Sequence, residues 1–312
     1  MEGNCQQIIH VPAPIPKASA RVPATPFQSH KSTQRINLLI EESLAIEAEA
    51  AKDAGALGFM AHALAQATMP HKRTEELRFT RTNGAFQLTI TALARHGLPY
   101  GAMPRLLIAW LTTEAVRTRS RELVLGDSLS EFMRGLGLVP TGGRWGSITR
   151  LRDQMQRLFS AAVTATYVDA NREMGTNYVM AEKYNMWWQP REPDQVALWE
   201  STLTLSGAFF EEAIRSPVPV DMRALKVLRR APMALDIYVW LTYRMSYLRR
   251  RTVIPWEALR LQFGAEYDRL VDFRVNFKKQ LKMVLLVYPD VKAIPTDSSL
   301  ELRPSRPHIR EK

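Results

Sequence analysis

The feature that most constrains this chain is a short pattern that occurs twice. The motif Trp-Leu-Thr stands at 110–112 and again at 240–242, and an arginine follows each copy at the same distance, as Arg121 and Arg251. Because the matches share one constant offset, they predict that the same folding unit is built twice within the 312 residues.

Both copies predict the same order of elements. In the first, Pro104, the capping box Ser128-Leu129-Ser130-Glu131 and the loop before Ser147 mark the starts of three helices, and the helix from Pro104 is expected to run to Val116. In the second, helices are predicted from Pro232, over 255–264 and over 267–288, with a short strand at 252–254. Three helices followed by β-strands describe a winged helix. The predicted fold class is therefore α+β, mainly helical, with two tandem winged-helix domains related by internal duplication.

The chain divides into four predicted segments. Residues 1–35 are rich in proline and read as a disordered arm, and residues 36–74 read as a helical segment. The first winged-helix domain covers 75–216, and the second covers 217–312 with a short C-terminal tail. Within the first, a hairpin is expected around Asn83-Gly84, and alternating residues predict strands at 165–168, 177–180, 186–188 and 198–205.

Positive charge is concentrated in two parts of the chain. The net charge is +11, and residues 221–292 carry 15 basic and 7 acidic side chains, whereas residues 101–160 carry 9 and 5. A basic protein of this kind is suited to a polyanionic partner, with nucleic acid as the first candidate. Two basic blocks are what two contacts with a phosphate backbone would require.

The third helix of the second domain is the main candidate for reading DNA. Its apolar stripe, from Leu270 to Val284, is expected to face the core. The opposite face would present Asn276 to base edges and lysines to guanine or phosphate. The alternative is an ordinary amphipathic surface helix. The predicted DNA-contacting residues of this region are Arg269, Arg274, Asn276, Lys278, Lys279 and Lys282.

The corresponding helix of the first domain is expected to position the protein on the DNA backbone rather than to read bases. It also presents Asp153, an acid that would face phosphates. Its predicted contact residues, with one in the preceding loop, are Arg144, Thr149, Arg150, Gln154 and Arg157. A run of three arginines after the long helix of the second domain would clamp phosphates or be a solvated surface; it consists of Arg249, Arg250 and Arg251.

No catalytic pattern is present in the sequence. There is no phosphate-binding G-x-x-x-x-G-K-[S/T] loop, and the six histidines never form H-x-H or H-E-x-x-H. A single cysteine, Cys5, gives no cysteine-based metal site within one chain. We therefore expect a protein that is not an enzyme, holds no cofactor or metal, contains no membrane span and is cytoplasmic.

A long stretch of the second domain resembles the C-terminal region of RepA-type plasmid replication initiators. The resemblance extends upstream to cover about 75–292. The residues that carry it are Phe209-Phe210-Glu211-Glu212, Pro217-Val218-Pro219-Val220-Asp221, Arg223, Pro232, Asp236, Trp240-Leu241-Thr242-Tyr243-Arg244, Ile254-Pro255-Trp256, Phe263-Gly264, Phe273 and Phe277.

The resemblance implies a bacterial, plasmid-encoded protein that binds direct repeats, called iterons, in duplex DNA at an origin. It implies that the protein helps to open the origin, recruits the host initiator and replicative helicase, and exists as monomer and dimer, the dimer acting as an autorepressor. Two alternatives stay open: a winged-helix transcriptional repressor with no role in initiation, and, less favoured, a nicking enzyme with an unrecognised tyrosine site.

Overall fold

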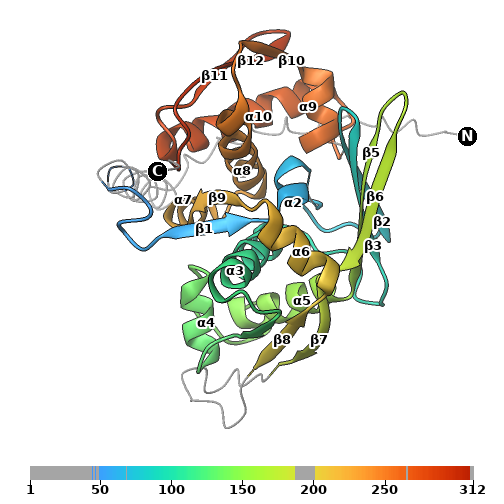
Figure 1. Ribbon diagram of the computed structural model, residues 1–312, viewed down its shortest axis with the longest axis vertical. Helices are drawn as coiled ribbons and strands as arrows, with labels where there is room; N and C mark the ends of the chain where they lie inside the picture. The colour runs from blue at the N-terminus through green and yellow to red at the C-terminus, as the bar shows by residue number, and fades with distance from the viewer. Residues whose placement is uncertain are drawn as a thin grey trace, which may run out of the picture. The chain divides into compact units, whose positions relative to one another are not determined.

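The computed structural model describes residues 44, 46, 49–67, 69–186, 201–264 and 266–309. The expected Pro-rich arm at 1–35 lies outside the described residues. The segment 36–74, expected to be helical, is not helical at Leu57–Met60, which forms strand β1 and is followed by the short helix α2, His62–Gln66 (Figure 1). Pairing with a distant strand here overrides the local helical pattern of an alanine-rich segment.

The predicted helices of the first copy are confirmed. Helix α3 spans Ala102–Thr118, with Pro104 in its first turn, and α4 spans Leu129–Gly135. The side chain of Ser128 accepts a hydrogen bond from the backbone N–H of Glu131 at 3.2 Å, so this residue caps α4 as the motif predicts. Helix α5 follows at Ser147–Phe159, and the strand β4, Glu122–Val124, lies between α3 and α4.

Two antiparallel sheets accompany these helices. The expected hairpin forms from β2, Arg78–Asn83, and β3, Phe86–Ala92, and its turn places Gly84 at a φ of 60°, which favours glycine. The four-stranded sheet has the order β2-β3-β5-β6, with β5 at Ala161–Val168 and β6 at Glu173–Val179. A second sheet has the order β4-β8-β7, with β7 at Ala181–Asn185 and β8 at Thr202–Leu205.

The second copy follows helix α6, Gly207–Arg215, strand β9, Val218–Asp221, and helix α7, Met222–Leu228. It contains α8 at Pro232–Tyr247, β10 at Thr252–Pro255, α9 at Trp256–Phe263 and α10 at Leu270–Val287. Its last residues differ from the expected tail. They form a hairpin of β11, Lys292–Pro295, and β12, Ser299–Arg303, which pairs with β10.

The two copies share one order of elements. We call residues 102–205 the first unit and residues 232–303 the second unit. Each runs helix, strand, helix, helix, and each ends in a hairpin that joins the short strand, giving the sheet orders β4-β8-β7 and β10-β12-β11. The first unit differs because β5 and β6 are inserted before its hairpin and join β2 and β3.

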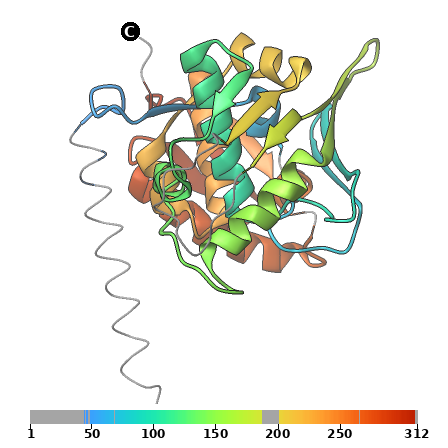
Figure 2. The ribbon, with the colours of Figure 1, turned by 90° about the horizontal axis from the view of Figure 1, so that it is seen from below.

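The two units are joined through their interiors. Strand β1 pairs with β9, with Leu57 opposite Asp221 and Met60 opposite Val218, and α3 packs against both β1 and α8. Strand β2 lies against α9 of the second unit (Figures 1 and 2). Residues 39–312 therefore form one compact unit, whose core includes buried side chains from both copies.

Candidate nucleic-acid interface

Helix α10 presents a charged face to solvent. Phe273, Phe277, Leu281 and Val284 are fully or almost fully buried, as the apolar stripe predicts. Lys279 and Lys282 are exposed on the opposite side. The exposed face therefore carries unburied ammonium groups, which can contact guanine.

Two further predicted contact residues of α10 border this face and are partly held in place. The ammonium group of Lys278 lies 5.7 Å from the centre of the Trp256 ring, and Arg274 donates to the backbone carbonyl of Asp297 at 2.7 Å. Asp297 lies in the turn between β11 and β12. Arg274 therefore links α10 to the terminal hairpin.

Asn276 does not occupy the outward face expected for it. Its side-chain N–H donates to the hydroxyl of Tyr267 at 2.6 Å and lies 3.4 Å from the sulfur of Met233 on α8. Its side-chain carbonyl accepts from Gln280 at 3.2 Å. On a helix this residue is about 100° from Val275, the exposed centre of the face, so it turns toward α8 instead of solvent.

Some of the arginines around the second unit contact carboxylates within the fold. Arg249 and Arg250 are exposed after α8. Arg251, although exposed, donates to Glu301 on β12 at 2.5 Å. Hydrogen bonds from Arg251 and Arg303 lower the pKa of Glu301 to about 2, so this carboxylate stays charged and holds β10 to β12. Arg269 is exposed and lies 3.6 Å from Asp272.

In the first unit, a rigid loop precedes α5. Thr141 and Ser147 close it, because each backbone N–H donates to the other's hydroxyl, at 2.9 and 2.8 Å. Its tip carries Arg144, whose guanidinium lies 5.2 Å from the ring of Trp145, a side chain that is 80% exposed. Thr149 and Arg150 are exposed at the start of the helix, as expected, although the Thr149 hydroxyl donates to the carbonyl of Gly143 at 2.9 Å.

Gln154 and Arg157 are buried, not outward as the helical pattern predicts. The side-chain carbonyl of Gln154 accepts from the backbone N–H of Tyr100 at 2.9 Å. The guanidinium of Arg157 donates to Asp153 at 2.9 Å and lies 5.3 Å from the ring of Tyr100. The loop at 98–101 packs on this side of α5 and uses both polar groups, so neither is available to DNA.

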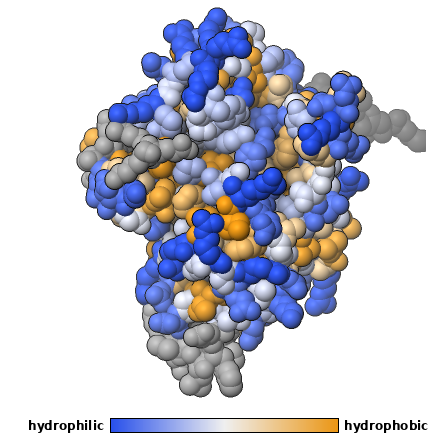
Figure 3. All heavy atoms as spheres, viewed as in Figure 1, coloured by the Kyte–Doolittle hydropathy of each residue, from blue (hydrophilic) through white to orange (hydrophobic). Residues whose placement is uncertain are grey.

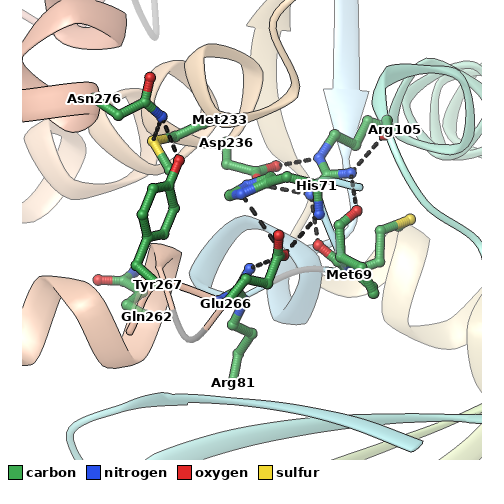
Figure 4. A network of polar contacts seen from close by, with 12 residues as sticks. Met69, His71, Arg81, Arg105, Met233, Asp236, Gln262, Glu266, Tyr267 and Asn276 are labelled. Carbon is green, nitrogen blue, oxygen red and sulfur yellow. Dashed lines mark hydrogen bonds and ion pairs between the residues drawn. The ribbon is translucent and has the colours of Figure 1, made fainter. Parts of the chain in front are cut away.

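A buried ionic network joins the two units, and no sequence pattern marks it (Figure 4). Arg105 on α3 binds Asp236 on α8 through two hydrogen bonds, at 2.6 and 2.8 Å. Its guanidinium also donates to the carbonyls of Met69 and Gly101, at 2.7 and 2.5 Å. Asp236 and Met69 lie far from Arg105 in sequence, so no local spacing identifies the network.

His71 lies beside this ion pair. Its Nε2 is 2.7 Å from Asp236, and both side chains are almost completely buried. Burial alone would raise the pKa of Asp236, but Arg105 and the hydrogen bond with His71 hold it below its ordinary value. Burial lowers the pKa of His71, and the hydrogen bond to Asp236 opposes this shift. The folded chain therefore holds a charged carboxylate and a neutral imidazole here.

A second ion pair extends the network to the four-stranded sheet. Arg81 on β2 is fully buried and donates to Glu266 at 3.0 Å, and the same carboxylate oxygen accepts from the backbone N–H of His71 at 2.9 Å. Burial lowers the pKa of Arg81 to about 10. The network is structural, because its charged groups pair with one another between the sheet, α3, α8 and the residues before α10.

The surface is hydrophilic where β10, β11 and β12 lie, at the top of Figure 3. Among the described residues, no cluster of three or more His, Cys, Asp or Glu side chains could hold a metal ion. No helix in the described part of the chain is long and apolar enough to cross a bilayer.

The fold is similar to that of solved structures. A crystal structure of domains 2 and 3 of RctB, a selenomethionine derivative, aligns with a TM-score of 0.53 at 13% identity, covering 79% of this chain and 96% of that one. Another structure of RctB domains 2 and 3 aligns with a TM-score of 0.49 at 13% identity, covering 77% and 96%. At this identity the similarity describes the fold alone. No curated protein sequence matches the chain.

A family model gives the assignment that structural similarity alone does not. The model described as plasmid-encoded RepA protein matches residues 98–258, from the loop before α3 to the first turn of α9. The match therefore includes the whole first unit but only the start of the second, through α8 and β10, and it ends before α10. It confirms the resemblance found in the sequence. Because it spans just over half of the 312 residues, the chain belongs to the plasmid-encoded RepA family of replication initiators.

Proposed function

We propose that this chain starts replication of a plasmid by binding repeated duplex sites at its origin, with the second unit reading bases and the first unit contacting the backbone. The observation that carries the proposal is the exposed, lysine-bearing face of α10 in a member of this family. A helix of this kind, next to a β-hairpin, is the arrangement by which winged-helix proteins enter the major groove.

The order of the elements supports two winged helices. Helices α8, α9 and α10, with β10 and the hairpin of β11 and β12, have the connections of such a domain. Helices α3, α4 and α5, with β4 and the hairpin of β7 and β8, repeat these connections. We propose that they arose by duplication, which also accounts for the sequence motif at 110–112 and 240–242.

Further roles follow from the family and extend the proposal. The chain would open an adjacent segment of the origin and recruit the host initiator and replicative helicase in the bacterial cytoplasm. A monomer–dimer equilibrium would separate initiation from autorepression. Strand β6 supports a dimer because it is an edge strand of the four-stranded sheet, and such edges can pair with a second copy.

A footprint on the origin region of the encoding plasmid tests this function. We expect protection of several direct repeats at regular spacing. Protection of one palindrome at the gene's own promoter, with no repeats, would instead indicate a transcriptional repressor. Incubation of supercoiled origin DNA with the protein and Mg²⁺ should produce no nicks, because we propose that the chain acts without a catalytic step. The appearance of nicked circles would contradict this.

A further inference from the structure

A cleft of about 860 Å³ lies between the first unit and the chain that leads into the second. Its walls come from the start of α3, the loop and first turns of α5, the turn between α7 and α8, and the segment at 71–73. Parts of the chain that are distant in sequence therefore meet there. The cleft is separate from the outward face of α10, whose residues do not line it.

The charges that line the cleft are strongly unbalanced. The cationic residues are Lys72, Arg73, Arg150, Arg229 and Arg230, and the only acid among the lining residues is Asp153. The carboxylate of Asp153 already accepts hydrogen bonds from Arg157 at 2.9 Å and from Gln154 at 3.0 Å. It is therefore not available to neutralise the cleft.

Three of these cations are available to a ligand. Lys72, Arg150 and Arg230 are exposed, and their side chains have no ion-pair partner within the described residues. The other two are partly engaged: Arg73 lies 3.3 Å from Glu75, and Arg229 donates to the carbonyl of Lys226 at 2.6 Å. One unpaired cation thus comes from each of three segments.

Like charges gathered in one concave site repel one another, and the site focuses a positive potential. A polyanion relieves this repulsion, and several spaced cations match successive phosphates better than one small anion. The positions are also well defined, since Arg150 stands in a regular helix and the bonds between Thr141 and Ser147 fix the loop beside it.

We propose that this cleft binds phosphates of one strand of duplex DNA, at the stretch of backbone that passes between the contacts of the first and second units. The inference rests on the proposed function, because it assumes that both units meet one duplex. The cleft is bordered by α5 and by the start of α8, the helix that packs against α10. Arg150 belongs to α5, whereas Pro232 begins α8, and the next residue, Met233, contacts Asn276 on α10. Small-molecule sites are more enclosed and more apolar than this open, cationic cleft.

The salt dependence of binding tests the proposal. The double variant Arg150→Gln/Arg230→Gln removes one cation from each side of the cleft and leaves Arg229 in place. Its affinity for a random-sequence duplex, measured by fluorescence anisotropy over a range of KCl concentrations, should show a log–log slope smaller by about 1.8, or about 0.9 for each phosphate that is no longer neutralised. The matched control Arg119→Gln/Arg172→Gln also removes two exposed charges, both outside the cleft, and should keep the wild-type slope.

Two other results would overturn the proposal that the cleft binds DNA. A folded double variant with the wild-type slope and affinity would overturn the proposal. Tripolyphosphate distinguishes a small anion from a DNA strand. If it raises the melting temperature of the wild-type protein but not of the double variant, while both bind DNA with the same slope, the cleft binds a small polyanion and the proposal is wrong.

A cleavage experiment maps the cleft on the DNA. The chain has a single cysteine, so Cys5→Ser with Arg230→Cys leaves one thiol to carry an iron chelate that cuts nearby DNA. On an origin repeat, cuts should fall between the base pairs that the second unit contacts and the backbone that the first unit contacts. Cuts at an outer end of the footprint would overturn the inference and leave the proposed function intact. Failure of the wild-type chain to bind any duplex would remove the proposed function itself.

Discussion

Helices α10 and α5 occupy the same place in their units but use their polar residues differently. On α10, Lys279 and Lys282 are exposed and face away from the core. On α5, Gln154 and Arg157 are buried against the loop at 98–101, and the exposed groups are near the start of the helix. Equal topology therefore does not give equal surfaces.

The net charge of a segment therefore differs from the charge that its surface presents to a binding partner. An arginine that binds a neighbouring carboxylate within the fold contributes to net charge but little to the attraction of phosphate. By this measure the second unit presents the exposed Lys279 and Lys282 on α10, the face that we propose reads bases. The first unit presents the loop tip with Arg144 and the first turn of α5, which are suited to the backbone.

The largest expected effect comes from breaking the buried ion pair between Arg105 on α3 and Asp236 on α8. Asp236→Ala leaves the guanidinium of Arg105, which is only 4% exposed, without its carboxylate. We expect the free energy of unfolding to fall by about 3–5 kcal/mol, since an unpaired buried charge is strongly destabilising. Urea denaturation followed by circular dichroism measures this.

The matched control is Asp272→Ala on α10. Its pair with Arg269 is exposed, so its removal should lower stability by less than about 1 kcal/mol. Equal effects of the two variants would mean that the buried network does not hold the units together.

The next effect compares the two helices on DNA directly. Lys279→Ala/Lys282→Ala should weaken binding to a random duplex by about 50- to 100-fold at 0.1 M salt and reduce the log–log salt slope by about 1.8, because two phosphates are no longer neutralised. Arg157→Gln on α5 should leave the slope unchanged, because its guanidinium binds Asp153 and the carbonyl of Leu98. Fluorescence anisotropy with folded variants measures the affinity and the salt slope. A similar decrease of slope in Arg157→Gln would contradict the difference between the two helices.

Local chemistry predicts much of this fold, and long-range contacts account for what it misses. Ser128 caps α4 through an interaction with its nearest neighbours, as predicted, and Asp221 and Gly264 stand in the same way at the start of α7 and the end of α9. The pairing of β1 with β9 joins segments far apart in sequence, which no local pattern reveals.

The same distinction applies to the candidate site. Residues at the centre of a polar helix face, such as Lys279 and Lys282, are exposed as their spacing predicts. Residues at its border, such as Asn276 and Arg157, turn toward whichever element packs beside them, and that element is set by the tertiary fold. The exposed face of α10 could therefore be predicted from the sequence, but its limits could not.

The stability of the protein should depend on pH through His71, which lies in the buried ionic network beside Arg105 and Asp236. Burial lowers the pKa of this imidazole in the folded chain, so protons bind the unfolded chain more tightly. The stability that comes from the neutral form is complete above about pH 6.5 and is lost as the pH falls below it, by up to about 1.4 kcal/mol per pH unit. Urea denaturation between about pH 7 and pH 5 measures the decrease.

His71→Gln is the control for this prediction. Its amide N–H can still donate to Asp236, but it does not titrate in this range. The pH dependence of its stability should be weaker than that of the wild type, although burial also lowers the pKa of His62 and His308, so some dependence should persist. A pH dependence as steep as in the wild type would show that His71 stays neutral in both states or is protonated in the fold.

The smallest expected effect concerns Asn276, which lies at the edge of the exposed face of α10 that we propose reads DNA. Its amide donates to the hydroxyl of Tyr267 at 2.6 Å, so Asn276→Ala should lower stability by about 0.5–1.5 kcal/mol, the usual value of one hydrogen bond. Affinity for an origin repeat and for random DNA should both stay within about twofold of the wild type, since removing a hydrogen bond to a base edge would instead weaken repeat binding by about 1–3 kcal/mol. Tyr267→Phe removes the acceptor of the same hydrogen bond. The double variant should therefore be as stable as the less stable of the two single variants. If a folded Asn276→Ala protein loses affinity only for the repeat, this side chain leaves Tyr267 when DNA binds, and the reading face extends beyond the two lysines.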